Sequence, residues 1–439
     1  MVSKNPLRTI VIGFFTVIMV GCLLLMMPFS SHGGVNFVDA LFTATSAVCV
    51  TGLVVVSMSH FTLIGQLIIL LLIQVGGFGY MSITSFVILA FKKKLSYRDQ
   101  IILKEAFNYT EIDSLTAFFR RVMMFALFSE ILGAVVLFFV FYPQFDFLKA
   151  FYFAVFHSIS AFNNAGFSLF SDSFVGYKYN VVLNFTVMAL IIAGGIGFIV
   201  VDELILFKKK VLKYISLHTK LTLLTTAILI FGGAFLIYLL ERNNILSGGG
   251  FFKDMLVSLF QSVTTRTAGF NTVNLISMHN STLFLMIVLM FIGASVGGTG
   301  GGIKTTTAAS VVVAIVSYIR GSKEVHIFKR RIPDEIVYKS FVIIILSFFV
   351  VSLAAFVLSD IENANFLSCL FETVSALSTV GLSISKTNLS LSNSFNDAGK
   401  LIIIFLMFAG RIGLFSFSVA LFRSSVQKRY SLPEGRIFV

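Results

Sequence analysis

The chain has 439 residues, of which 57% are apolar and 12% are charged, and its formal net charge is +13. Soluble globular domains carry about 25% charged residues, so this composition cannot cover a water-facing surface. It excludes a soluble enzyme, a secreted disulfide scaffold and a disordered chain. Three cysteines lie far apart within apolar segments (Cys22, Cys49 and Cys369), which predicts buried, reduced thiols.

Long apolar runs dominate the chain and lie near residues 9–29, 62–91, 122–142, 180–207, 219–240, 280–319, 337–359 and 398–423. A helix of about 20 apolar residues crosses the hydrocarbon core of a bilayer, so an all-α, polytopic membrane protein with eight transmembrane helices is predicted. Most Lys and Arg residues gather near residues 1–8, 92–121, 208–220, 320–339 and 423–436. The positive-inside rule places these segments, and both termini, in the cytoplasm.

Four shorter apolar segments alternate with the long runs, at Phe37–Val48, Phe147–Phe162, Phe251–Thr265 and Ala364–Leu377. They are too short to span a bilayer and are typical of re-entrant helices. Each contains a similar core, which begins at Phe42, Phe156, Phe260 or Phe371, and each is followed by a glycine: Gly52, Gly166, Gly269 or Gly381. The separation from phenylalanine to glycine is 10, 10, 9 and 10 residues. The third copy is one residue short, so a different backbone is allowed before its glycine.

A second glycine motif follows each of these glycines by 24, 28, 28 and 29 residues, beginning at Gly76, Gly194, Gly297 and Gly410. One such motif is typical of close helix packing, but four in register indicate a fourfold repeat of helix, pore helix and helix around one central pore. The predicted units are 1–91, 122–207, 219–319 and 337–424, joined by cytoplasmic linkers 92–121, 208–218 and 320–336 and followed by a cytoplasmic tail, 425–439.

The segments that end in the first glycine of each repeat are the candidate ion filter: Val50-Thr51-Gly52, Asn164-Ala165-Gly166, Thr267-Ala268-Gly269 and Thr379-Val380-Gly381. An ion that leaves water needs its hydration shell replaced, and rings of backbone carbonyls do this. Irregular backbone at membrane depth is tolerated where it lines a wet cavity, and glycine permits the dihedrals. Because no strand carries a carboxylate, carbonyls and the negative ends of the short helices must attract the cation.

Several motifs resemble those of the ion-conducting subunits of Trk/Ktr/HKT potassium transporters, most closely the Ktr-type membrane subunit: Thr45–Leu53, Gln74–Gly79, Arg266–Phe270, Gly297–Thr305 and Tyr430–Val439. The resemblance covers nearly the whole chain. It implies a K⁺-translocating subunit of the bacterial plasma membrane, often Na⁺-stimulated, with K⁺ held by filter carbonyls. It also implies a homodimer on a cytosolic, nucleotide-binding (RCK-type) ring, with the nucleotide on that partner, and neither a covalent cofactor nor enzymatic activity. Gly52 matches the K⁺-selective form of the family.

Residues 293–304 hold six glycines and are expected to interrupt the third repeat alone. A plain helix break is one interpretation; the family resemblance favours a movable gate, formed by Gly297, Gly298, Thr299, Gly300, Gly301, Gly302 and Lys304 together with Arg411. Arg411 lies inside the fourth glycine motif, where a charge is costly in a membrane. It either caps carbonyls or restricts cation flow below the filter, and the second interpretation is favoured.

Two further polar positions lie near the filter. Arg266 precedes the third strand, and a hydrogen bond to Glu372 is expected to support the filter. His157 is interpreted as a packing histidine rather than a proton relay. A secondary symporter with broken helices is the alternative function, but its repeats alternate in orientation, whereas here all four repeats begin in the cytoplasm.

Overall fold

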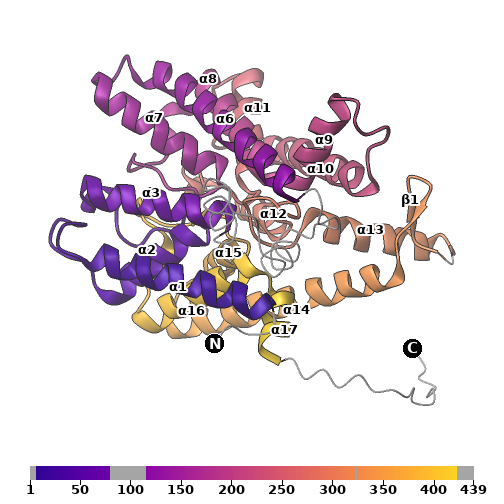
Figure 1. Ribbon diagram of the computed structural model, residues 1–439. Helices are drawn as coiled ribbons and strands as arrows, with labels where there is room; N and C mark the ends of the chain where they lie inside the picture. Colours follow the sequence, from indigo (N-terminus) through magenta and orange to yellow (C-terminus); the bar gives the residue numbers. More distant parts are fainter. Residues whose placement is uncertain (1–5, 80–114, 323, 423–439) are drawn as a thin grey trace.

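The computed structural model describes residues 6–79, 115–322 and 324–422. Within these residues the chain is almost entirely helical (Figure 1). The predicted tail 425–439 and most of the predicted linker 92–121 lie outside the described residues. The helix expected to begin near residue 122 begins earlier, at Leu115.

The first helix of each repeat is long and continuous: α1 (Pro6–Met26), α6 (Leu115–Phe141), α10 (Leu217–Glu241) and α14 (Asp334–Ile361). Among the described residues these four helices are each long and apolar enough to cross a membrane. Large apolar side chains such as Phe139, Phe231 and Phe348 are exposed on them. Such a surface is stable in lipid but not in water, which agrees with the composition.

The four pore helices are α2 (Phe37–Val48), α7 (Phe147–Phe162), α11 (Phe251–Thr264) and α15 (Phe366–Leu377). Their bounds agree with the sequence prediction to within two residues. The phenylalanine that begins each core is completely buried. Beyond each filter strand lies a short 3₁₀ helix: η1 (Met58–His60), η2 (Val175–Tyr177), η3 (Leu275–Ser277) and η4 (Leu391–Ser394). The predicted repeat is therefore present in the fold.

The second helix of each repeat ends or is interrupted at its glycine motif. They are α3 (Leu63–Phe78), the pair α8 (Val181–Gly195) and α9 (Phe198–Lys208), the pair α12 (Asn280–Phe291) and α13 (Thr305–Ile319), and the pair α16 (Asp397–Ile412) and α17 (Leu414–Phe422). The α8/α9 pair is bent by 96°. Gly79, Gly197 and Gly413 have φ of 73°, 99° and 91° at these helix ends, where only glycine is unstrained. The expectation that the third repeat alone is interrupted is wrong.

The repeats form a closed ring. The second helix of each repeat packs on the pore helix of the next, through α3 and α7, α8 and α11, α12 and α15, and finally α16 and α2. Lys400 of α16 also donates to Asp39 of α2 over 2.7 Å, which joins the last repeat to the first.

In the first, second and fourth repeats the first glycine of the motif allows its helix to approach the pore helix closely. A Cβ atom on Gly76, Gly194 or Gly410 would lie 2.0, 1.8 or 1.8 Å from the carbonyl oxygen of the last pore-helix residue in the same repeat. Those oxygens belong to rigid backbone, so no neighbouring side chain can move aside to make room.

We therefore expect Gly410→Ala to destabilise the folded protein by about 1–3 kcal/mol or more, because the added methyl collides with the Leu377 carbonyl. Gly232→Ala in α10 is the matched control: it also adds a methyl to a helical glycine, but nothing lies within 4 Å. That variant should gain up to about 1 kcal/mol from helix propensity. Thermal unfolding in detergent measures both, and equal stability of the two variants would refute the packing argument.

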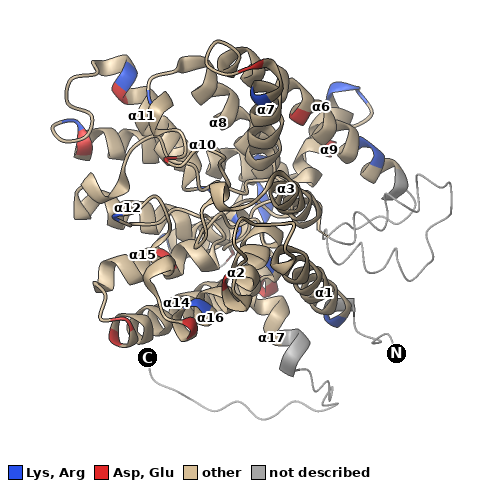
Figure 2. Cartoon of the chain, turned by 90° about the vertical axis from the view of Figure 1, so that its left-hand side faces the viewer, with Lys and Arg blue, Asp and Glu red and all other residues tan. Residues whose placement is uncertain are grey.

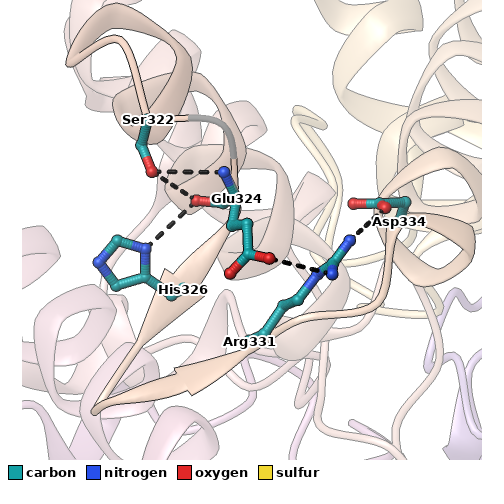
Figure 3. Close-up of polar contacts among 5 residues, drawn as sticks. All are labelled: Ser322, Glu324, His326, Arg331 and Asp334. Atoms are coloured by element: carbon teal, nitrogen blue, oxygen red, sulfur yellow. Dashed lines mark hydrogen bonds and ion pairs between the residues drawn. The ribbon is translucent and has the colours of Figure 1, made fainter.

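The predicted linker 320–336 contains a small antiparallel hairpin, β1 (His326–Ile327) and β2 (Arg330–Arg331). Arg331 donates to Glu324 over 3.1 Å and to Asp334, in the first turn of α14, over 2.7 Å (Figure 3). Ser322 also donates to the Glu324 carbonyl. The hairpin thus connects the end of α13 firmly to the start of α14.

Charged residues lie mostly at the ends of helices and in loops, with a few Lys and Arg segments at the centre (Figure 2). The three cysteines are free and buried, as predicted. A cavity of about 820 Å³ lies between the glycine motifs and the ends of α1, α10, α13 and α14.

Candidate functional site

The four filter strands share one backbone pattern. Their first residues, Val50, Asn164, Thr267 and Thr379, have φ between 52° and 69°, and their glycines have φ between 69° and 92°. Left-handed residues that alternate with ordinary ones turn successive carbonyls toward one side of a strand. Four non-glycine residues adopt this strained conformation at equivalent positions. Such strain is typical of functional sites.

A hydroxyl group near the end of each pore helix holds the strand that follows. Ser46 donates to the Leu53 carbonyl over 2.8 Å, and Ser160 donates to the Phe167 carbonyl over 2.7 Å. In the fourth repeat the Gly381 N–H donates to Ser375 Oγ over 3.0 Å. These bonds replace the helical ladder where the strand leaves the helix.

The third repeat has one residue fewer between its core phenylalanine and its filter glycine, and the turn between the pore helix and the strand is shorter as a result. In the other repeats the N–H of the residue before the filter glycine donates to a carbonyl five residues back, as from Thr51 to Ser46. In the third repeat Ala268 donates to Thr264, only four residues back, and the Thr264 hydroxyl still reaches the Phe270 carbonyl over 2.6 Å. The strand itself therefore keeps the common pattern.

The strands pack in a ring that closes on itself. A Cβ atom on Gly52 would lie 2.5 Å from the Ala165 carbonyl oxygen, and one on Gly381 would lie 2.1 Å from that of Thr51. Gly166 and Gly269 face the Ala268 and Val380 oxygens in the same way, at 2.8 and 2.5 Å. Each filter glycine thus touches a carbonyl of the next repeat, and a side chain at any of the four positions would open the ring.

The segment between α12 and α13 lies directly against the inner end of the filter. The Gly301 N–H donates to Thr379 Oγ1 over 2.9 Å, and a Cβ atom on Gly300 would lie 1.9 Å from Thr267 Oγ1. The Lys304 ammonium donates to the Gly300 carbonyl over 2.9 Å. The loop is thereby fixed to the first residues of the third and fourth strands.

Arg411 bridges this loop to the first repeat. Its guanidinium donates to the carbonyls of Thr299, Gly76 and Gly77, the last over 3.0 Å. Arg411 and Lys304 both line the 820 Å³ cavity. The residues predicted to form a gate therefore meet in one place. Arg411 makes the carbonyl-capping contacts that were one interpretation of it, and one of them, to Thr299, reaches the glycine loop.

The expected bond between Arg266 and Glu372 is absent. Glu372 accepts from Ser383 Oγ over 2.6 Å and from the Ser392 N–H over 3.0 Å. Arg266 is 7% exposed, and its Nε has no hydrogen-bond partner. Glu372 lies in the middle of α15, whereas Arg266 lies beyond the end of α11, so the two residues reach different levels of the ring.

Glu372 occupies a position that has a polar side chain in every repeat, equivalent to Thr43, His157 and Gln261. Gln261 donates to Thr272 Oγ1 over 3.1 Å. The His157 ring pairs with the Phe153 carbonyl and Ser168 Oγ, at 2.7 and 3.0 Å, and stacks on Phe170. In three repeats this side chain therefore ties the pore helix to the segment after the filter, and the interpretation of His157 as a packing residue is confirmed.

Sequence reasoning missed a buried polar cluster of Glu130, Gln74 and Asn163. Gln74 Nε2 donates to both carboxylate oxygens of Glu130, over 3.0 and 3.1 Å, and Asn163 Nδ2 donates to one of them over 3.1 Å. One signal was visible: Glu130 is the single charged residue in the apolar run 122–142. Intramembrane carboxylates are functional candidates by default.

Comparison with known proteins was made on the whole chain. The sequence model of the TrkH family, described as a cation transport protein, matches residues 4–431. The chain is 38% identical to Ktr system potassium uptake protein B of Bacillus subtilis over 440 residues, which cover 100% of this chain and 97% of that protein. It is 40% identical to the protein of the same name from Vibrio alginolyticus, over 92% of this chain and 89% of that one.

Two further relatives extend the comparison. Potassium/sodium uptake protein NtpJ of Enterococcus hirae is 38% identical, over 99% of this chain and 97% of that protein. The crystal structure of the potassium transporter TrkH from Vibrio parahaemolyticus has the same fold, with a TM-score of 0.75 and 18% identity over 96% of this chain and 86% of that one. The resemblance drawn from the sequence motifs is confirmed: the chain belongs to the TrkH family of cation transport proteins.

Proposed function

We propose that this chain conducts K⁺ across the bacterial plasma membrane through the ring of four filter strands. The observation that carries the proposal is the closed contact of each filter glycine with a carbonyl of the next repeat. A ring of backbone carbonyls replaces the hydration shell of a cation. The relatives named as potassium uptake proteins support K⁺ as the ion.

Attraction of the cation comes from the backbone in this proposal. The pore helices end at Val48, Phe162, Thr264 and Leu377, immediately before the filter strands. Their negative dipole ends therefore lie beside the strands. Residues near the starts of α1, α10 and α14 border the same cavity, and this shared orientation supports a pore over the alternative of a symporter with inverted repeats.

In this proposal residues 293–304 form the gate, and hydrogen bonds from Arg411 hold it closed. The loop fills the space directly under the third and fourth strands, and Arg411 holds it to Gly76 and Gly77 of the first repeat. A fixed positive charge at this depth also repels a cation. Opening requires that the loop leave Thr379 and that Arg411 release Thr299.

We propose that a cytosolic, nucleotide-binding ring moves the loop 293–304 away from the filter. In the same proposal this chain acts as a homodimer, and Na⁺ stimulates K⁺ uptake. The support is the resemblance, the basic segments between the repeats and the relatives' designation as parts of a Ktr system. The hairpin that joins α13 to α14 offers a mechanical path, because α13 follows directly on Lys304. The nucleotide belongs to the partner.

Uptake by a bacterium that lacks its own K⁺ transporters tests the function. We expect K⁺-dependent growth to be restored by this chain, and the rate of uptake to rise when the cytosolic partner is co-expressed. Measurement of Rb⁺ or K⁺ uptake with and without the partner gives both results. Absence of K⁺ uptake from membranes that contain the folded chain would refute the conduction proposal, while full regulated uptake without any soluble subunit would refute the partner.

A further inference from the structure

A buried carboxylate lies behind the filter without a cationic neighbour. Glu130 in α6 is 6% exposed, and no Lys, Arg or His lies within ion-pair distance of it in the described part of the chain. Its side-chain partners are the amide groups of Gln74 and Asn163, which both donate to it. The two donated hydrogen bonds favour the ionised form of this carboxylate and burial opposes it, and an unpaired charge at membrane depth is costly unless it has a use.

The carboxylate is joined to the filter by a single residue. Asn163 caps the C-terminus of α7, and the next residue, Asn164, begins the second filter strand. Because Asn163 Nδ2 lies 3.1 Å from Glu130 Oε1, the negative charge lies close behind the start of that strand. The negative end of the α7 dipole points to the same place.

The cluster of Glu130, Gln74 and Asn163 also lies next to the residues that bind Arg411. Gln74 lies in the last turns of α3, shortly before Gly76 and Gly77, whose carbonyls accept from Arg411. Asn163 Oδ1 occupies the space that a Cβ atom on Gly77 would need, at 1.9 Å. Glu130 and Arg411 are thus opposite charges on two sides of the end of α3.

We propose that Glu130 sets the affinity of the inner filter for K⁺ by supplying a fixed negative charge behind the second strand. This inference rests on the proposed conduction through the filter. Arg411 and Lys304 place two positive charges under a filter that has no carboxylate of its own. In a low-dielectric surrounding a charge acts over several ångströms, so Glu130 offsets their field where the ion enters the strand.

The test compares Glu130→Gln with the wild type in a K⁺-transporter-deficient bacterium that also expresses the cytosolic partner. Glutamine has nearly the same shape and can still accept from Gln74 or Asn163, but it carries no charge. We expect the KM for K⁺ to rise roughly three- to tenfold, with Vmax and thermal stability unchanged. An unchanged KM in a folded Glu130→Gln protein would overturn the proposal.

Glu241→Gln is the matched control. Glu241 at the end of α10 is also a buried carboxylate, 1% exposed. It accepts from the His279 N–H and Thr282 Oγ1 at the start of α12 and from Asn244 Nδ2 just after α10. The same chemical change far from the filter should leave KM unchanged. An equal rise of KM in both variants would overturn the proposal, because it would reflect a general loss of packing.

Two more variants separate charge from anchoring. If Glu130→Gln fails to accumulate, Glu130→Asp keeps the charge, and the proposal requires its KM to stay closer to the wild type than that of Glu130→Ala. Equal KM values for Asp and Ala would overturn it. Loss of K⁺ uptake by the wild type would instead refute the conduction proposal itself, so the two failures are distinguishable.

Discussion

Replacement of Gly52 by serine is expected to lower the preference of uptake for K⁺ over Na⁺ by about tenfold, which corresponds to about 1.4 kcal/mol of differential binding. Gly52 has φ of +91°, and a Cβ atom there would lie 2.5 Å from the Ala165 carbonyl oxygen and 3.0 Å from Gly166 Cα. The serine must therefore displace the second strand. Carbonyls that no longer match the size of K⁺ discriminate less against the smaller, more strongly hydrated Na⁺.

Competition of Na⁺ with ⁸⁶Rb⁺ uptake measures this preference, alongside the KM for each ion. Gly248→Ser is the matched control, because Gly248 has φ of +103° and nothing lies within 4 Å of its Cβ position. It imposes the same backbone strain at a site outside the ring. Unchanged relative affinities in Gly52→Ser, or an equal change in both variants, would argue against a filter role for Gly52.

Removal of several residues from the glycine loop 297–302 is expected to raise K⁺ flux roughly three- to tenfold and to weaken its dependence on the partner. The loop lies against the inner end of the proposed filter and is held by bonds from Gly301 to Thr379 and from Arg411 to Thr299. Without it, a cation leaving the filter enters the 820 Å³ cavity directly. Arg411→Ala should act in the same direction but less, because the loop itself remains in place.

Uptake of ⁸⁶Rb⁺ with and without the partner measures both effects. Arg411→Lys separates the two roles of the arginine: lysine keeps the positive charge but cannot reach three carbonyls of two segments at once. If the hydrogen bonds of Arg411 hold the loop more than its charge repels the cation, we expect Arg411→Lys to raise K⁺ flux nearly as much as Arg411→Ala does. A folded deletion variant with unaltered flux and unaltered partner dependence would show that the gate lies elsewhere.

The sequence alone determined the repeat and the pore helices. Apolar segments of 12–16 residues cannot span a bilayer, and the glycine that follows each one marks where the helix must end. For this reason the bounds of α2, α7 and α11 could be read closely from the chain. The family was also visible at this level, because the filter and gate motifs are contiguous in sequence.

The tertiary structure decided what depends on contacts between repeats. The sequence could not show that the second helices of the second and fourth repeats are also interrupted, because one glycine at a left-handed φ, such as Gly413, ends a helix without changing its apolar pattern. Nor could it pair Glu372, whose partners follow from the depth of α15 in the ring. The cluster around Glu130 joins three segments 33 to 89 residues apart. Only the packing of α3 and α6 on α7 brings Glu130, Gln74 and Asn163 within hydrogen-bond distance, because their polarity is satisfied across helices and not along them.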